Sequence, residues 1–309
     1  FWMLIAKWNF SMTKAKKPWR KKAKKFYPVE DSPFYKMQSE KKLSALLHTS
    51  VTALRGMIDK SVPHYEYWEE KKSDGSMRPL CRPHEGLDKA QSRIAYLLAC
   101  IKTPDYVHAP VPKKTYVTNA AAHRGSRSFC LMDIESFYPS CREEKILAFF
   151  RHRMKCSLDV ATILARLCCD NGSLPQGSSS SPILSYWAYS EMWDAVHEIA
   201  TNAGNIFTLY IDDLTVSGKI VSGKTIWKIQ QQIHKHGLSI KAQKTRWIVD
   251  KPADVTGVII NPAGLRLPNR QHKKLAQAKS EFAKPGGNRK LKANVLRGRE
   301  AQAGQILNH

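Results

Sequence analysis

Two adjacent carboxylates, Asp212 and Asp213, lie between residues 206–210 and 214–217. Both flanking runs are rich in β-branched and aromatic residues, so the segment predicts a β-hairpin with the two aspartates at its tip. Two anions side by side repel each other, and they are stable either in solvent or when a divalent cation bridges them. Aspartate is also a common residue of ordinary turns, so this pair alone does not establish a metal site.

A third carboxylate, Asp133, ends the apolar run 129–132, which predicts a buried strand. If that strand pairs beside the hairpin, Asp133, Asp212 and Asp213 converge as oxygen ligands for two Mg²⁺ ions. Two such ions activate an attacking hydroxyl and stabilise a leaving pyrophosphate. The three aspartates together therefore indicate nucleotidyl transfer, the chemistry of polymerases.

Several blocks around these aspartates resemble the motifs of one polymerase family. The run Tyr-Ile-Asp-Asp that ends at Asp213 resembles the Tyr-x-Asp-Asp signature of reverse transcriptases. Upstream, the run Leu-Pro-Gln-Gly that ends at Gly177 resembles the family's third block, in which a glutamine lies against the incoming nucleotide. Downstream, residues 237–245 resemble the block whose Lys-Thr pair lies near the triphosphate. These blocks occur in the family's order and spacing, which argues against coincidence. The resemblance covers residues 71–306, with departures.

Two further motifs resemble those of bacterial retron reverse transcriptases. The run Asn-Ala-Ala-Ala-His from Asn119 to His123 resembles their Asn-Ala-x-x-His motif, and the triplet Val255, Thr256 and Gly257 resembles their Val-Thr-Gly motif. Alone, His123 is typical of an ordinary hydrogen-bonded histidine, and the triplet is typical of a strand end. Their joint placement around the polymerase blocks favours the retron subfamily.

The resemblance implies a role for each matching residue near the metals. Asp133 and Asp212 are expected to bind both Mg²⁺ ions, with Asp213 close by and the Ile134 carbonyl as a further ligand. Tyr138 matches the aromatic residue that blocks a ribose 2′-hydroxyl; the alternative is an ordinary core aromatic.

Nucleotide and RNA contacts are implied in the same way. Gln176 is expected to contact the incoming nucleotide, Arg78 its phosphates, and Lys244 to protonate pyrophosphate. Asp88 departs from the pattern, because many relatives have a basic residue there. RNA contacts are expected from the two retron-type motifs and from the basic C-terminal region: Asn119, His123, Val255, Thr256, Gly257, Arg270, Lys273 and Lys274.

The chain is strongly basic, with 50 Lys and Arg against 26 Asp and Glu, a formal charge of +24 and a pI near 9.8. Such a chain favours a polyanionic partner, nucleic acid above all. The seven cysteines include no Cys-x-x-Cys pair, which favours buried thiols over zinc or redox chemistry. No run of about 18 apolar residues is present, and the N-terminal stretch is too short for a secretory signal, so we expect a bacterial cytoplasmic protein that binds no membrane.

The alternating helical and extended segments predict an α+β fold. The resemblance implies a right-hand polymerase, with an antiparallel palm sheet that carries the aspartates. We expect a basic arm over residues 1–40, fingers and palm over 41–250, and a thumb-like basic region over 251–309. Residues 255–260 are predicted as one strand, and one helix is predicted from Ser181 to near Gly204.

As a retron enzyme, the chain is expected to copy part of a structured noncoding RNA into single-stranded DNA. The resemblance implies that synthesis starts from a 2′-hydroxyl of a guanosine in that RNA, uses dNTPs and leaves RNA-linked DNA. It also implies a role in anti-phage defence with a separate effector protein. Two alternatives stay open: a reverse transcriptase of the group II intron or diversity-generating type, and a catalytically idle RNA-binding scaffold.

Overall fold

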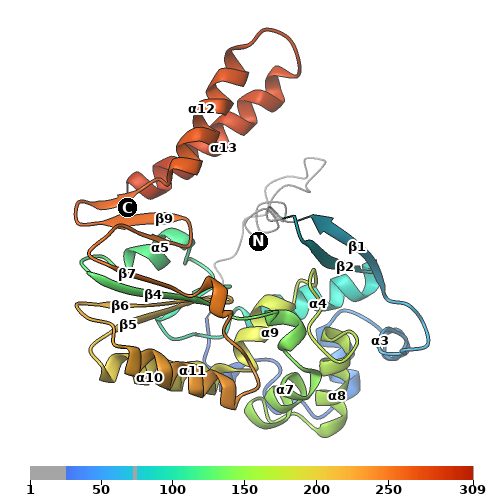
Figure 1. Cartoon of the computed structure of the whole chain (residues 1–309). Helices are drawn as coiled ribbons and strands as arrows, with labels where there is room; N and C mark the ends of the chain where they lie inside the picture. Colours follow the sequence, from blue (N-terminus) through green and yellow to red (C-terminus); the bar gives the residue numbers. More distant parts are fainter. Residues whose placement is uncertain (1–25, 72–74, 309) are drawn as a thin grey trace.

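A five-stranded sheet, here called the central sheet, organises the computed structural model, which describes residues 26–71 and 75–308 (Figure 1). The strand order is β3-β5-β6-β4-β7. Neighbours β5, β6, β4 and β7 pair antiparallel, whereas β3 pairs with β5 in parallel. The expected antiparallel sheet is therefore correct except at its β3 edge. Its strands are β3 (Val107–Ala109), β4 (Ser128–Asp133), β5 (Ile206–Tyr210), β6 (Asp213–Gly218) and β7 (Arg246–Val249).

Strand β4 is apolar on both faces because both faces of the sheet are covered. Cys130 and Met132 belong to the main hydrophobic core, whereas Phe129 and Leu131 belong to a second, smaller core. Successive side chains of a strand point to opposite faces. A strand buried on both faces therefore reads as a continuous apolar run, and this accounts for the run that precedes Asp133.

Three helices of the main core follow the Leu-Pro-Gln-Gly run that ends at Gly177. They are α9 (Ser181–Trp187), α10 (Ser190–Asn202) and α11 (Gly223–Lys235), and α10 and α11 lie below the central sheet in Figure 1. The single helix predicted from Ser181 to near Gly204 is wrong: α9 ends at Trp187, and α10 begins at Ser190. In α11, Ile226, Ile229 and Ile233 are buried at helical spacing, as the sequence predicts.

Residues 29–98 and the segment 137–168 after β4 build the region to the right of the sheet in Figure 1. An antiparallel hairpin of β1 and β2 stands above α4, whose buried face follows helical spacing through Leu87, Ile94 and Leu98. The elements of this region are η1 (Val29–Asp31), α2 (Glu40–Leu46), α3 (Val51–Met57), β1 (Tyr65–Lys71), β2 (Met77–Pro83), α4 (Glu85–Leu98), α6 (Phe137–Ser140), α7 (Glu143–Ala148), η2 (Phe149–Arg153) and α8 (Leu158–Cys168).

The C-terminal region consists of a small sheet and a helical arm. The small sheet contains β8 (Ala253–Val255), β9 (Val258–Asn261) and β10 (Gly264–Arg266), and the helical arm contains α12 (Asn269–Ala283), α13 (Arg289–Leu307). The single strand predicted over 255–260 is wrong, because the chain reverses at Thr256 and Gly257 and Val255 pairs with Val258. The small sheet and helix α5 (Tyr116–Ala121) cover the upper face of the central sheet and enclose the second core.

The fold class is mixed α and β, as predicted. All seven cysteines are buried and free. No helix within 26–71 and 75–308 is long and apolar enough to cross a membrane. Of the predicted basic arm, residues 1–25 lie outside the described part of the chain, and residues 29–31 form η1.

Candidate active site

The pairing of β4 with β6 brings the three aspartates together at one end of the central sheet. Asp133 is the direct cross-strand partner of Asp213. Asp212 precedes Asp213 in the turn between β5 and β6, and its carbonyl accepts a hydrogen bond from the Ile134 N–H at 3.1 Å. Residues nearly 80 positions apart in sequence therefore meet, as the sequence predicted.

The turn that carries Asp212 holds a β-branched residue in the left-handed region. Ile211 has φ +62° and is 4% exposed, with its side chain in the main core. A β-branched residue is rarely found at positive φ, so burial of this side chain helps to hold the turn. Tyr210 and Asp213 pair across the turn, and the hairpin reversal is therefore two residues long.

Three carboxylates share a half-buried site with one lysine. Burial, and then the charges of Asp213 and Asp133, raise the pKa of Asp212 above its ordinary value. Burial and Asp133 likewise raise the pKa of Asp213. Lys244 Nζ lies 2.9 Å from Asp133 Oδ2. Burial alone would lower the pKa of Lys244, but the bond to Asp133 and the three negative charges raise it.

The donor set fits a hard divalent cation better than any other metal. The three side chains supply only oxygen, and their negative charge exceeds what Lys244 balances, which is the situation that Mg²⁺ relieves. In the described ranges, no three His, Cys, Asp or Glu side chains already surround a common point closely enough to hold a metal ion. Lys244 contacts the Asp133 carboxylate through one oxygen, Oδ2, and a carboxylate has two oxygens that can accept.

Two open cavities border Asp213. One, of about 240 Å³, lies toward the small sheet, between Asp213 and the turn at Thr256 and Gly257. The other, of about 290 Å³, includes Asp133 and Lys244. Arg246 lines both, so the two cavities lie next to each other at this end of the sheet.

The expected nucleotide-binding residues Gln176 and Arg78 lie on elements that touch. The Gln176 carbonyl accepts a hydrogen bond of 3.0 Å from the Cys81 N–H on β2, the strand that also carries Arg78. A Cβ on Gly177, whose φ is +139°, would lie 1.9 Å from the Cys81 carbonyl oxygen. Only glycine permits this approach. This requirement explains the glycine of the Gln-Gly pair in physical terms.

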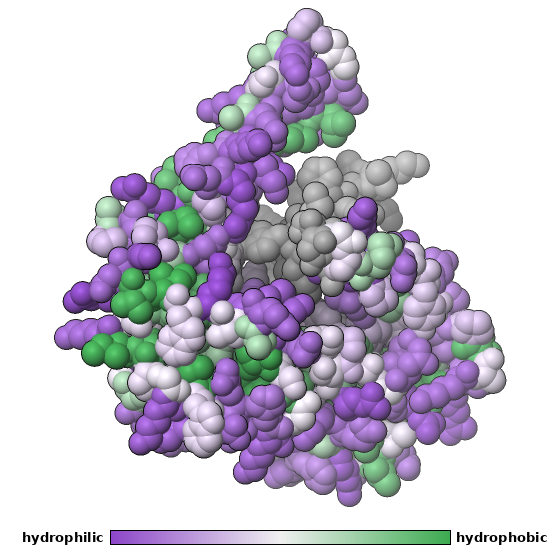
Figure 2. All heavy atoms as spheres, in the orientation of Figure 1, coloured by the Kyte–Doolittle hydropathy of each residue, from purple (hydrophilic) through white to green (hydrophobic). Residues whose placement is uncertain are grey.

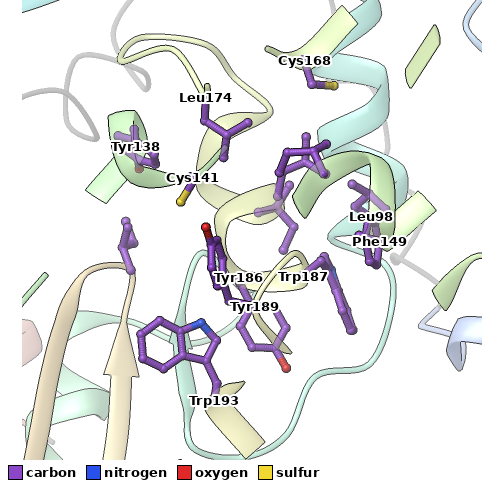
Figure 3. Close-up of a cluster of buried hydrophobic side chains, with 14 of the residues drawn as sticks. Leu98, Tyr138, Cys141, Phe149, Cys168, Leu174, Tyr186, Trp187, Tyr189 and Trp193 are labelled. Carbon is purple, nitrogen blue, oxygen red and sulfur yellow. The ribbon is translucent and has the colours of Figure 1, made fainter. Parts of the chain in front are cut away.

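Tyr138 lies on α6, and its side chain is 6% exposed. Figure 3 shows it beside Cys141 and Leu174, at the edge of a cluster that contains Tyr186, Trp187 and Trp193. Burial and the nearby charge of Asp212 raise the pKa of Tyr138 well above its ordinary value. Its role as a ribose gate stays a prediction.

The family model for reverse transcriptases, RNA-dependent DNA polymerases, matches residues 70–260. The chain belongs to the reverse transcriptase family. It is 26% identical over 243 residues to the Retron Ec86 reverse transcriptase of Escherichia coli, a match that covers 75% of this chain and 74% of that enzyme. The predicted resemblance to retron reverse transcriptases and the predicted enzyme class are thereby confirmed.

Two other relatives are also retron enzymes. The Retron Se72 reverse transcriptase of Salmonella heidelberg is 26% identical over 210 residues, and the Retron Ec48 reverse transcriptase of Escherichia coli is 26% identical over 253 residues. The matches cover 66% and 76% of this chain. They span 55% and 62% of those two relatives, so the chain matches less than two thirds of their length.

Three residues expected to contact RNA lie inside this reverse transcriptase. Asn119 is 1% exposed, His123 0% and Val255 1%. Asn119 and His123 are hydrogen-bonded to other protein side chains, and Val255 lies in the second core. Side chains in these positions present no surface to RNA, so the expected direct contacts are corrected to contacts within the protein.

The remaining expected RNA contacts are closer to the surface. Thr256 and Gly257 form the turn beside the 240 Å³ cavity, and Arg270, Lys273 and Lys274 are exposed on α12. Arg270 is paired with Asp254, at 2.7 Å.

Arg246 and Asp254 were absent from the predicted site, although both line a cavity beside Asp213. The signal for Arg246 was its place directly after the Lys-Thr pair. Asp254 had no comparable signal, because an aspartate before a Val-Thr-Gly triplet is typical of an ordinary strand. Only the fold of the small sheet places it beside the cavity.

Proposed function

We propose that this reverse transcriptase is the RNA-directed DNA polymerase of a retron. It copies part of a structured noncoding RNA into single-stranded DNA, starts from the 2′-hydroxyl of a guanosine in that RNA, and leaves the DNA linked to the RNA. The observation that carries the polymerase activity is the pairing of Asp133 with Asp213, which brings all three aspartates to one sheet end. The retron assignment is supported by the retron relatives and by the two retron-type motifs.

In the proposed reaction, Asp133, Asp212 and Asp213 hold Mg²⁺, with the Ile134 carbonyl as a further ligand. Bound Mg²⁺ supplies positive charge that favours ionisation of the attacking hydroxyl and stabilises the departing pyrophosphate. Lys244 already lies at the edge of this site and donates a proton to pyrophosphate.

The nucleotide is positioned by residues outside the metal site. Gln176 contacts the incoming dNTP, and Arg78 contacts its phosphates from β2. Tyr138 excludes a ribose 2′-hydroxyl. These roles are supported by the contact between the Gln176 turn and β2 and by the place of Tyr138 near Asp212.

The partners follow from the proposed function. They are the cognate noncoding RNA, its DNA product, dNTPs and a separate effector protein in anti-phage defence, in a bacterial cytoplasm. The high positive charge supports the nucleic-acid partners.

The test compares wild type with Asp212→Asn/Asp213→Asn in Mg²⁺-dependent DNA extension on RNA that co-purifies with the protein. The double substitution removes two anionic ligands while nearly preserving shape, so synthesis should vanish. RNA binding in a filter assay should persist, because the substitutions remove negative charge and leave the basic surface intact. Asp159→Asn, an exposed aspartate on α8, is the matched control and should keep both properties.

Residual synthesis by the double variant would contradict the metal assignment. A wild type that makes no DNA on any RNA it carries would favour the scaffold alternative. The subfamily is tested by the product: a 2′-linked RNA–DNA branch, cleaved by a debranching enzyme, is expected of a retron, and a linear product would favour a group II intron or diversity-generating enzyme.

A further inference from the structure

The two retron-type motifs meet in one chain of hydrogen bonds. Asn119 Nδ2 on α5 donates to Thr256 Oγ1 at 3.2 Å, and the Thr256 hydroxyl donates to the Tyr116 carbonyl at 3.1 Å. Helix α5 therefore holds the Thr256 side chain through both a side chain and its own backbone. These residues are about 140 positions apart in sequence.

Thr256 has an unusual backbone conformation. It has φ +46° and Gly257 has φ +88°, and together they form the two-residue turn between β8 and β9. Turns with positive φ at both positions favour Asn, Asp or Gly first. A β-branched threonine there costs on the order of 1–3 kcal/mol. The Thr256 hydroxyl offsets this cost through its two bonds to α5.

The segment directly after α5 is fixed to the strands that carry the catalytic turn. His123 Nδ1 lies 2.7 Å from Ser217 Oγ on β6, and His123 Nε2 lies 2.7 Å from Thr208 Oγ1 on β5. The turn at Ile211 and Asp212 joins these same two strands. A continuous set of bonds therefore runs from β5 and β6 through α5 to the Thr256 turn.

The Thr256 turn forms a wall of the 240 Å³ cavity beside Asp213. The Gly257 N–H donates to Asp254 Oδ1 at 3.0 Å, and Arg270 binds the same carboxylate. A shift of the turn would therefore move Asp254 and Arg270 as well, and it would change the width of the cavity next to the reacting centre.

We infer that Asn119 and His123 are positioning residues, which set the distance between the Thr256 turn and Asp213 and so align the nucleic-acid end that carries the attacking hydroxyl. The inference rests on the proposed polymerase function. Misalignment by about 1 Å can reduce rate a hundredfold without a change in binding. Loss of this positioning should therefore lower kcat and leave the KM for dNTP unchanged.

The test uses a preformed primer–template and single-nucleotide addition, so that initiation on the cognate RNA is not required. Thr256→Val keeps the β-branch and loses the hydroxyl, and kcat should fall about tenfold or more, with the KM for dNTP within about twofold. Thr256→Ser keeps the hydroxyl and should restore most of kcat. Asn119→Ala combined with Thr256→Val should be no slower than Thr256→Val alone, because both remove the same contact.

Two further variants separate positioning from stability. Thr256→Gly relieves the strained φ but loses both hydroxyl bonds, so the net change in its free energy of unfolding should be small, yet kcat should fall as it does in Thr256→Val. Thr225→Val removes a threonine hydroxyl bond on α11, far from the cavity, and is the matched control with unchanged kcat.

Two outcomes in kcat would overturn the inference alone: a Thr256→Val enzyme as fast as Thr225→Val, or losses of kcat that track thermal stability across the series. A wild type that extends no primer would overturn the proposed function together with the inference. An altered KM for dNTP at constant kcat would also contradict the inference, because that result would place the effect in nucleotide binding.

Discussion

Ile211 and Thr256 are β-branched residues at positive φ, in two turns on either side of Asp213. The free-energy cost of the positive φ is offset in a different way at each residue. Ile211 buries its side chain in the main core, whereas Thr256 uses its hydroxyl to bind α5. Backbone strain of this kind persists only where the surroundings over-determine the conformation. The Thr256 turn lines the cavity beside Asp213, and the Ile211 turn leads directly into Asp213.

Tyr138→Val should allow incorporation of ribonucleotides, because the substitution removes the ring expected to clash with a 2′-hydroxyl. The measurement is extension of one primed template with dNTP and with rNTP, with kcat/KM compared for each. Tyr189→Phe, which keeps a buried ring and loses the hydroxyl that donates to the Ser140 carbonyl, is the control and should keep the wild-type ratio. Equal discrimination in wild type and Tyr138→Val would make Tyr138 an ordinary core residue.

His123 should make stability fall as the pH falls. Burial, and then the nearby His108, lower the pKa of His123 to about 3. In the unfolded chain the pKa is about 6.5, so below that pH the unfolded state binds the extra proton and is favoured. The loss begins near pH 6.5, reaches about 2 kcal/mol at pH 5, and continues toward pH 3.

The measurement for His123 is urea unfolding of wild type and His123→Gln from pH 7.5 to pH 5. Gln cannot titrate, so its stability curve should be flatter by about the amount given above. Parallel curves for the two proteins would show that His123 does not contribute to the acid sensitivity.

At the scale of elements, the decisive contact outside the central sheet is that of the Gln176 turn with β2. The turn approaches so closely that a Cβ at Gly177 would overlap the Cys81 carbonyl. The buried Gln91 strengthens the junction, because its amide binds Tyr65 on β1 and Ser178 directly after the turn. The β1–β2 hairpin therefore moves with the turn that carries Gln176.

Gly177→Ala should destabilise the enzyme by about 1–3 kcal/mol, the usual effect of overpacking, and raise the KM for dNTP. The reason is that the backbone must move apart and carry Gln176 with it. Gly56→Ala on α3, where a Cβ meets nothing within 4 Å, is the control and should stabilise by about 0.5–1 kcal/mol. Urea unfolding and dNTP titration check both, and an unchanged KM would separate Gly177 from nucleotide binding.

For the whole molecule, the helical arm is a strongly basic region of the described residues, because residues 269–308 carry ten Lys and Arg against two Glu. Figure 2 shows the arm largely covered by hydrophilic side chains. Its exposed basic residues include Arg270, Lys273 and Lys274 on α12. Of these three, Arg270 is paired with Asp254, so part of its charge is already balanced within the protein.

RNA affinity should fall steeply with salt, and Lys273→Ala/Lys274→Ala should flatten the log–log slope by roughly 0.7–0.9 per lysine. A variant that contacts fewer phosphates releases fewer counterions when it binds RNA, and its slope is therefore reduced. Lys228→Ala/Lys235→Ala on α11, below the central sheet, is the control and should leave the slope unchanged. Equal slopes for the two double variants would show that α12 is only a solvated surface.

The sequence by itself determined the strands that carry the aspartates, the helical spacing of α4 and α11, and the family. These properties depend on local periodicity and on short motifs, which can be recognised without knowledge of the tertiary contacts. The apolar run 129–132 also indicated that β4 is buried on both faces. In the structure its side chains alternate between the two cores.

Only the tertiary structure decided what the motif residues contact. Asn119 and His123 looked like polar residues available to RNA, but packing of α5 between the central and small sheets buries both. The reversal at Thr256 was hidden because its turn carries a β-branched residue, which local propensity assigns to a strand. Contacts such as Asn119 with Thr256 and Lys244 with Asp133 join residues more than 100 positions apart. They form only after several elements have packed together, so no local pattern in the sequence contains them.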